Sequence, residues 1–160
     1  MKQSHRPAIK QYFSLMTAGD VDGVLSLFAP DAKSSECGWR VEVGHEALRT
    51  HLLQLRANTS KRTYSISTLV RDGDVVVAEW QAELTFRPGA QLGSREVTER
   101  FSLTLHGATV FRFAGNLIAE IRHYFDRGEL PTIAGAHVIE RRSELPEMIG
   151  TIPVSDRPLT

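Results

Sequence analysis

The sequence has little of what several large classes of protein require. Its 160 residues include one cysteine, Cys37, which excludes an internal disulfide framework and a zinc site built from several cysteines. This composition fits a reducing compartment, and we expect a cytoplasmic protein. Nineteen basic residues balance nineteen acidic ones, without a run of five or more like charges. We therefore expect no binding to nucleic acid or to a membrane surface.

The sequence also lacks the patterns of membrane spans, metal sites and phosphate-binding loops. No apolar stretch approaches the roughly 20 residues that a membrane span needs, and the polar segment 1–10 lacks the apolar core of a signal peptide. No histidines and carboxylates fall at a metal-binding spacing such as His-Glu-x-x-His. No glycine-rich loop follows a strand and opens a helix, as a phosphate-binding site would require. We predict that the protein uses no metal and no organic cofactor.

The apolar residues that are present suffice for one core. A chain of 160 residues with 41% hydrophobic content is typical of a single domain. We predict that residues 1–130 form this domain. Residues 131–160 hold four of the seven prolines, and we predict a largely irregular tail there.

Helical periodicity dominates the N-terminal part of the chain. Apolar residues at helical spacing predict helices over residues 9–16, 21–28 and 46–55. Asp20 is placed to cap the second helix, whose apolar stripe stops before Pro30. Between the second and third helices, the segment from Ala32 to Val43 alternates only weakly, which is consistent with two short strands or with a strand and a loop.

From Asn58 to Phe125 the period becomes that of β-strands, and we predict four of them. The clearest strand places even-numbered apolar residues from Val76 to Phe86 on one face, which we expect to be buried. Gly107 interrupts a later alternating stretch and predicts a bulge or a sharp bend. The last strand has a predicted apolar face made of Leu117, Ala119, Ile121, His123 and Phe125.

Helices that precede a run of antiparallel strands predict an α+β fold. We expect a cone-shaped, curved antiparallel sheet that encloses an apolar pocket together with the three N-terminal helices. The polar residues on the other face of the sheet, such as Glu79, Glu83 and Arg122, are expected to meet either water or a second copy of the chain in a homodimer. The pocket predicts a small apolar organic ligand as the partner.

His123 is the residue that we rank first for chemistry. It falls in phase with Ile121 and Phe125 and should therefore point toward the apolar side. A histidine there can act as a general acid or base, because its unperturbed pKa of about 6.5 lies near working pH. The alternative is a core histidine held by one hydrogen bond.

Three more residues carry groups suited to catalysis. Glu36 lies beside Trp39, and a carboxylate next to apolar surface can abstract a proton near neutral pH; the alternative is a solvated residue on an edge strand. Tyr12 lies on the inward stripe of the first helix, and its hydroxyl can donate to a substrate oxygen or to a backbone carbonyl. Asp126 follows the last strand, and a turn at the strand end would bring it back toward the pocket.

Aromatic residues supply the expected substrate-binding walls. These are Trp39, Trp80, Phe111 and Phe125.

Three segments carry a resemblance to a known superfamily: YFSLMTAGDVDGVLSLFAPDA, GHEALRTHL and VFRFAGNLIAEIRHYFD, which are residues 12–32, 44–52 and 110–126. With these segments, residues 5 to 130 resemble the nuclear transport factor two-like superfamily, in particular SnoaL-like polyketide cyclases, ketosteroid isomerases and limonene epoxide hydrolases. The resemblance implies a fold more strongly than a reaction, because one fold supports many functions.

The resemblance also implies roles for individual residues. Tyr12 falls where ketosteroid isomerases place an oxyanion-hole tyrosine, Glu36 falls where they place the carboxylate base, and Thr109 falls where they place a protonated aspartate. The water-activating arginine and two aspartates of the hydrolases would align with Trp80, Ala82 and His123.

The function expected from residues and resemblance together is a cofactor-independent isomerase or cyclase. It would act on a small, mostly apolar carbonyl compound, polyketide-like or steroid-like, by general acid and base proton transfer. One alternative is a non-catalytic module for small-molecule binding or dimerisation. Another is a hydrolase or dehydratase in which His123 activates water.

Overall fold

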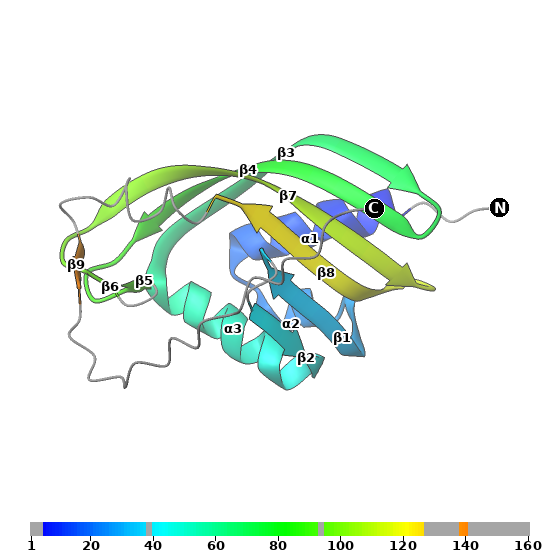
Figure 1. Cartoon of the computed structure of the whole chain (residues 1–160), viewed down its shortest axis with the longest axis horizontal. Coiled ribbons are helices and arrows are strands. Elements are labelled where there is room, and N and C mark those ends of the chain that lie inside the picture. The colour runs from blue at the N-terminus through cyan, green and yellow to red at the C-terminus, as the bar shows by residue number, and fades with distance from the viewer. Residues whose placement is uncertain (1–4, 38–39, 93–94, 127–137, 141–160) are drawn as a thin grey trace, which may run out of the picture.

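A computed structural model describes residues 5–37, 40–92, 95–126 and 138–140. In these residues a curved six-stranded sheet arches over three helices (Figure 1). In chain order the elements are α1 (Arg6–Ala18), α2 (Val21–Leu25), β1 (Phe28–Glu36), β2 (Arg40–Val43), α3 (Gly44–Asn58), β3 (Thr59–Asp72), β4 (Val75–Phe86), β5 (Gln91–Leu92), β6 (Arg95–Val97), β7 (Phe101–Ala114), β8 (Leu117–Phe125) and β9 (Val138–Glu140).

The helices begin near the positions that the sequence predicts. Pro7 stands in the first turn of α1, where its missing N–H costs no hydrogen bond. Asp20 caps α2 as expected, because its Oδ1 accepts a hydrogen bond of 2.9 Å from the backbone N–H of Gly23. The predicted helix over 46–55 is confirmed and longer than expected, since α3 begins at Gly44 and ends at Asn58.

The predicted extent of the second helix is wrong. Helix α2 ends at Leu25, and Phe28 already begins β1. The cause is pairing with a distant strand: Phe28 pairs with Ile118, whose backbone N–H donates to the Leu27 carbonyl at 2.8 Å. Phe28 fits the helical spacing only by chance. Its side chain is buried in the same core as those of α2, but it enters that core from strand β1.

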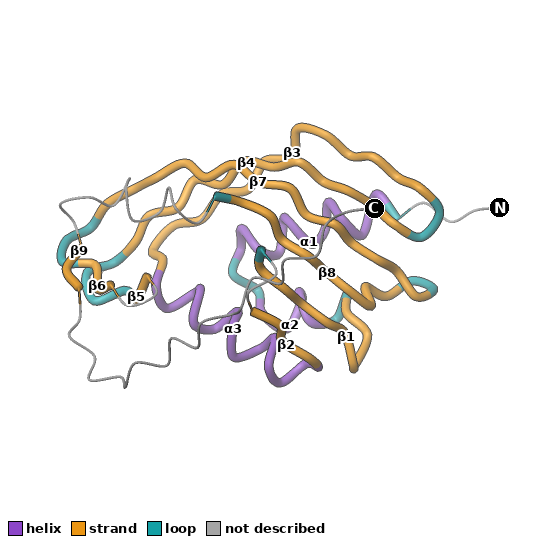
Figure 2. Tube along the Cα trace, in the orientation of Figure 1, coloured by secondary structure: helices purple, strands orange, loops and turns teal. Residues whose placement is uncertain are grey.

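The large sheet has the strand order β2-β1-β8-β7-β4-β3. The pairing of β1 with β8 is parallel, and the other pairings in this sheet are antiparallel. The weakly patterned segment 32–43 is thus resolved into strand β1 and edge strand β2. All three helices lie under the concave face, with α1 packed on β3 and α3 on β1 (Figure 2). The predicted α+β class and curved sheet are confirmed.

Strand β4 confirms the alternation from which the fold was predicted. Its six even-numbered residues from Val76 to Phe86 are each at most 6% exposed, and they face the helices. Glu79 and Glu83 are exposed on the opposite face. Because successive side chains of a strand point to opposite faces, this one pattern orients the central part of the sheet.

Gly107 does not form the predicted bulge. Strand β7 runs through it, and the register between β4 and β7 advances without a shift from Phe86 to Val75. A Cβ atom at this position would collide with the ring of Trp80, which is the residue paired with Gly107. The glycine therefore serves side-chain packing across the sheet rather than a change of strand direction.

The irregularity lies instead in β8. Arg112 of β7 pairs with Glu120, and the next residue, Phe113, pairs with Ile118, which leaves Ala119 as an extra residue. Such a bulge changes which side chains face inward. Ile118 is consequently buried, whereas the predicted inward residue Leu117 is 38% exposed.

A second, small sheet has the order β5-β6-β9. Its last strand, Val138–Glu140, pairs with β6 and lies within the segment that the sequence predicted to be irregular. The rest of the predicted tail lies outside the described residues. None of the described helices has the length and apolar character needed to cross a membrane.

Candidate functional site

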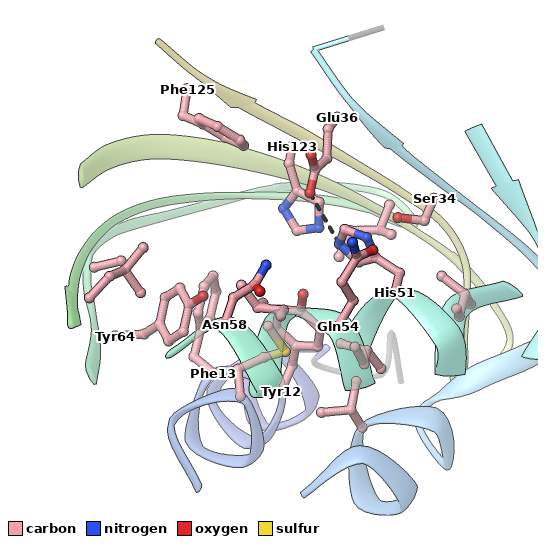
Figure 3. A pocket seen from close by; sticks show the side chains of 18 of the residues that line it. Tyr12, Phe13, Ser34, Glu36, His51, Gln54, Asn58, Tyr64, His123 and Phe125 are labelled. Atoms are coloured by element: carbon pink, nitrogen blue, oxygen red, sulfur yellow. Dashed lines mark ion pairs between the residues drawn. The ribbon is translucent and has the colours of Figure 1, made fainter. Parts of the chain in front are cut away.

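A cavity of about 410 Å³ lies between the concave face of the sheet and the helices (Figure 3). Most of its wall is apolar, and none of the lining residues that the structure describes is a lysine or an arginine. Polar groups enter the cavity from Tyr12, Ser34, Glu36, His51, Gln54, Asn58, Tyr64, Gln91 and His123. An apolar hollow with a few convergent polar groups is typical of a small-molecule site.

The cavity brings together most of the residues that the sequence singled out. Tyr12, Glu36, Trp80, His123 and Phe125 all line it.

Three of the predicted site residues are not found in the wall. Phe111 is fully buried in the core, because its ring packs edge-on against Tyr12 and Phe13 with centroid distances of 5.3 and 6.1 Å. Asp126 is exposed beyond the end of β8 and does not line the cavity, so the strand end does not turn it back. Trp39 lies outside the described residues.

Strand pairing explains why Glu36 and His123 meet. Glu36 stands opposite His123 in the parallel pair β1 and β8, and His123 stands opposite Thr109 in the antiparallel pair β8 and β7. Paired residues on neighbouring strands have side chains on the same face and about 5 Å apart. A row of three polar side chains therefore crosses the concave face of the sheet.

His51 joins this row from helix α3. Its Nε2 lies 3.1 Å from Oε1 of Glu36, and its Nδ1 lies 3.3 Å from Oε1 of Glu42. The Glu42 side chain is 8% exposed and those of Glu36 and His51 are about one-fifth exposed. A carboxylate oxygen therefore lies within ion-pair distance of each ring nitrogen of His51.

The sequence-based prediction missed His51. The available signal was its spacing: it follows the buried Leu48 by three residues and so lies on the same side of α3.

His123 is held from the side opposite to Glu36. The indole Nε1–H of Trp80 donates to Oγ1 of Thr109 at 2.8 Å, and the same oxygen lies 2.9 Å from Nδ1 of His123. Burial lowers the pKa of His123 to about 4, against the opposing effect of Glu36 and with a smaller lowering from His51. Burial outweighs the effect of Glu36, and His123 is neutral at pH 7.

Two tyrosine hydroxyls complete the polar lining. Within the described residues, no side chain or backbone group hydrogen-bonds to the hydroxyl of Tyr12 or of Tyr64. Burial raises the pKa of Tyr64 to about 12 and the pKa of Tyr12 well above its ordinary value. Glu36 contributes to both shifts, which places the tyrosines within its electrostatic reach. Both phenols therefore stay protonated and are available as hydrogen-bond donors to a ligand.

The polar groups occupy two sides of the cavity. Figure 3 shows Glu36, His51 and His123 together on one side, with Tyr12 and Tyr64 across from them. A ligand between the two sides meets a carboxylate that can accept a proton and neutral donors that can bind an oxygen. Among the described residues, no group of three His, Cys, Asp or Glu side chains is arranged to hold a metal ion.

Comparisons with known proteins agree with the fold. The family model described as a SnoaL-like domain matches residues 9–121. No curated protein matches the chain.

Solved structures with the same fold share little sequence with this chain. A protein described as a SnoaL-like polyketide cyclase, from Shewanella denitrificans, superposes with a TM-score of 0.71 at 16% identity, over 80% of this chain and 94% of that one. An NTF2-like protein of unknown function from Burkholderia pseudomallei gives 0.70 at 17% identity, over 84% and 100%. TerC, co-crystallised with polyporic acid, gives 0.65 at 15% identity, over 80% and 95%.

Proposed function

Because the chain belongs to the SnoaL-like family, we propose that it is a cofactor-independent isomerase or cyclase that acts on a neutral, mostly apolar carbonyl compound. The observation that carries the proposal is one cavity in which the Glu36 carboxylate faces two tyrosine hydroxyls that have no hydrogen-bond acceptor among the described residues. Such a cavity supplies a proton acceptor and oxyanion donors at the same time.

The proposed reaction begins with proton abstraction. Glu36 takes a proton from the carbon next to the substrate carbonyl. The electron pair of that C–H bond forms a C=C bond while the π pair of the carbonyl moves onto its oxygen, which gives an enolate. Tyr12 donates a hydrogen bond to this oxygen, where a positioned donor acts on charge that develops in the transition state. In an isomerase, Glu36 returns the proton to another carbon. In a cyclase, the enolate carbon attacks a second carbonyl and forms a C–C bond, the π pair of that carbonyl moves onto its oxygen, and the alkoxide takes the proton back from Glu36.

His51 has a positioning role in this scheme. Its ion pair with Glu36 fixes the direction of the carboxylate before substrate binds. The pair with Glu42 on the other side holds the imidazole ring. Ion pairing also weakens Glu36 as a base, so the arrangement suits a substrate whose proton is already acidic, such as one next to a ketone and an aromatic ring or between two carbonyls.

The charge of the cavity supports a neutral substrate. No lysine or arginine is found among the described lining residues, whereas Glu36 is one of them. A carboxylate or phosphate on the substrate would have no cation of that kind to pair with, and bringing it next to Glu36 would be costly. A ketone or a quinone meets no such penalty. The proposal therefore covers polyketide-like and steroid-like carbonyl compounds.

Proton exchange on a simple ketone tests the proposal without knowledge of the natural substrate. We suggest 2-tetralone, a neutral bicyclic ketone with acidic α-protons, incubated in D2O with the full chain. The rate of deuterium uptake at the α-carbon is followed by NMR. Glu36→Gln should reduce the enzyme-dependent rate about 100-fold or more, the usual scale for loss of a general base.

A matched control separates this effect from a general loss of charge. Glu83→Gln makes the same change on the exposed face of β4 and should leave the exchange rate unaltered. Binding of 2-tetralone is measured in parallel by tryptophan fluorescence, because Trp80 lines the cavity. Binding with exchange no faster than in buffer would contradict the proposal and favour a non-catalytic binding module.

A further inference from the structure

Three neighbouring strands supply a hydrogen-bonded chain that ends on His123. Trp80 comes from β4, Thr109 from β7 and His123 from β8. The Thr109 side chain is fully buried, with 0% exposure. The two contacts of its hydroxyl, 2.8 Å to Trp80 Nε1 and 2.9 Å to His123 Nδ1, are therefore not exchanged for water.

The chemistry of these groups fixes the direction of each hydrogen bond. The indole nitrogen of Trp80 can only donate, so Oγ1 of Thr109 accepts from it. The Thr109 hydroxyl has one hydrogen, and within the described residues its one remaining partner is Nδ1 of His123. A buried hydroxyl that left this hydrogen unbonded would lose free energy. Nδ1 is therefore the acceptor.

The tautomer of His123 follows from this. An imidazole that accepts a hydrogen bond at Nδ1 and is neutral carries its hydrogen on Nε2. If Nδ1 carried a hydrogen, the ring N–H and the Thr109 O–H would both be donors, and the hydroxyl hydrogen would lose its acceptor. The burial that lowers the pKa of the ring acts in the same direction. The free nitrogen of His123 thus bears a hydrogen at pH 7 and cannot accept a proton.

The orientation of the ring directs the Nε2–H of His123 into the cavity. With Nδ1 turned toward β7, the other nitrogen of the ring points away from Thr109, to the cavity side where Glu36 and His51 lie (Figure 3). A ligand oxygen held next to Glu36 is within range of this donor.

We propose that His123 acts as a neutral hydrogen-bond donor to the substrate oxygen, not as the catalytic base, and that Thr109 and Trp80 are positioning residues that set its tautomer. The inference rests on the proposed function, since it assigns a second donor beside Tyr12 to the same enolate oxygen. Of Glu36 and His123, which the pairing of β1 with β8 brings together, Glu36 is then the one that accepts the proton. A neutral donor suits this place because it stabilises the developing charge without trapping the oxygen as a protonated product.

Nitrogen NMR on the full chain reads the tautomer directly. With 15N-labelled histidine at pH 7, the resonances of His123 are assigned by their loss in His123→Gln. We expect a non-protonated, pyridine-type signal for Nδ1 and a protonated, pyrrole-type signal for Nε2. A protonated Nδ1 in the unaltered protein would overturn the inference.

Variants of Thr109 test whether the chain sets that state. Thr109→Val keeps the shape of the side chain but removes the hydroxyl, and should shift the nitrogen signals of His123 toward the other tautomer or the charged form. Thr109→Ser should restore the original signals. Thr104→Val, the same substitution at an exposed position of β7, is the matched control. If Thr109→Val fails to fold, Thr109→Ala removes the same hydroxyl from a smaller side chain. Unchanged His123 signals in a folded Thr109→Val or Thr109→Ala protein would also overturn the inference.

Kinetics provide the second readout. In the 2-tetralone assay, Thr109→Val should lower kcat about 10-fold with little change in KM, a smaller loss than removal of an oxyanion donor outright, and Thr109→Ser should recover the rate. The two proposals fail separately. Absence of exchange in the unaltered protein overturns the proposed function and the catalytic use of the donor, while the nitrogen signals still decide whether Thr109 and Trp80 set the tautomer.

Discussion

The indole ring of Trp80 occupies the space that a side chain at Gly107 would fill. The two residues stand opposite each other in the pairing of β4 with β7, and a Cβ on Gly107 would also approach the Tyr124 carbonyl to 2.8 Å. The absence of a side chain on one strand thus allows a large ring on the next strand to lie against the sheet. From this position Trp80 reaches Thr109 and, through it, His123.

Gly107→Ala should therefore damage both packing and the site. We expect a loss of about 1–3 kcal/mol in the free energy of unfolding, the usual cost of overpacking, together with weaker binding of 2-tetralone because Trp80 is displaced from the cavity wall. Urea unfolding measures the first effect and fluorescence titration the second. In a Trp80→Leu background the added cost of Gly107→Ala should be smaller; an equal cost in both backgrounds would contradict the explanation.

Tyr12→Phe should separate catalysis from stability. The hydroxyl has no hydrogen-bond partner within the described residues, so its removal should change the free energy of unfolding by less than about 1 kcal/mol. The exchange rate should fall about 100-fold, because a donor to the enolate oxygen is lost. Thermal unfolding and the 2-tetralone assay measure the two quantities. Tyr124→Phe alters a tyrosine that is 46% exposed on β8 and should change neither quantity.

His51→Gln should lower both stability and activity. The change removes the imidazole that lies between Glu36 and Glu42, and removing one partner of buried polar groups costs about 1–3 kcal/mol. Exchange should slow because Glu36 loses the partner that orients it. Urea unfolding and α-proton exchange test this expectation, with His106→Gln, at an exposed position of β7, as the control. A variant with unaltered exchange would remove His51 from the mechanism.

His123 should make the folded protein less stable in acid. Its pKa is about 4 in the folded chain, against about 6.5 when unperturbed. Between these values the unfolded chain binds a proton that the folded chain does not, so the free energy of unfolding falls as the pH drops from about 6.5 to 4, by about 3 kcal/mol in full. Above pH 6.5 this group contributes no pH dependence.

His123→Gln isolates that contribution. The neighbours Glu36 and His51 titrate as well, but they are present in both proteins. Urea unfolding at pH 7.5 and pH 4.5 should show a smaller loss of stability in the variant than in the unaltered chain. The same loss in both would mean that His123 is protonated in the folded protein, contrary to the neutral state argued above.

Periodicity alone was enough to predict the class of fold. The spacing of Ile9, Tyr12, Phe13 and Met16 predicts α1, and the alternation from Val76 to Phe86 predicts β4 with its buried face. Both patterns depend on the local repeat of a helix or a strand, so they can be read without a partner. Tyr12, Glu36, Trp80, His123 and Phe125 were predicted as site residues for a related reason, because each is a polar or aromatic residue in or beside an apolar pattern.

What the local repeat could not decide is which strand pairs with which, and in what register. The pairing of β1 with β8 ended α2 early at Leu25 and set Glu36 opposite His123. Because of the bulge at Ala119, Ile118 points inward and Leu117 points outward, the opposite of what simple alternation from Ile121 predicts. Phe111 kept its predicted inward direction, yet it packs against Tyr12, which lines the cavity, and does not line the cavity itself.

The sequence by itself therefore determined the three helices in outline, the long strands, the buried face of the central strand and the candidate residues, since side-chain alternation and helical spacing are local properties of the chain; it did not show the short strands β5 and β6. Only the tertiary structure decided that His51 lies between Glu36 and Glu42, and that Thr109 and Trp80 control the ring of His123. The register that sets Glu36 opposite His123, 87 positions further along the chain, also brings Thr109 beside His123, and helix packing brings in His51. No local pattern specifies those distances, because they depend on how the whole core packs at once.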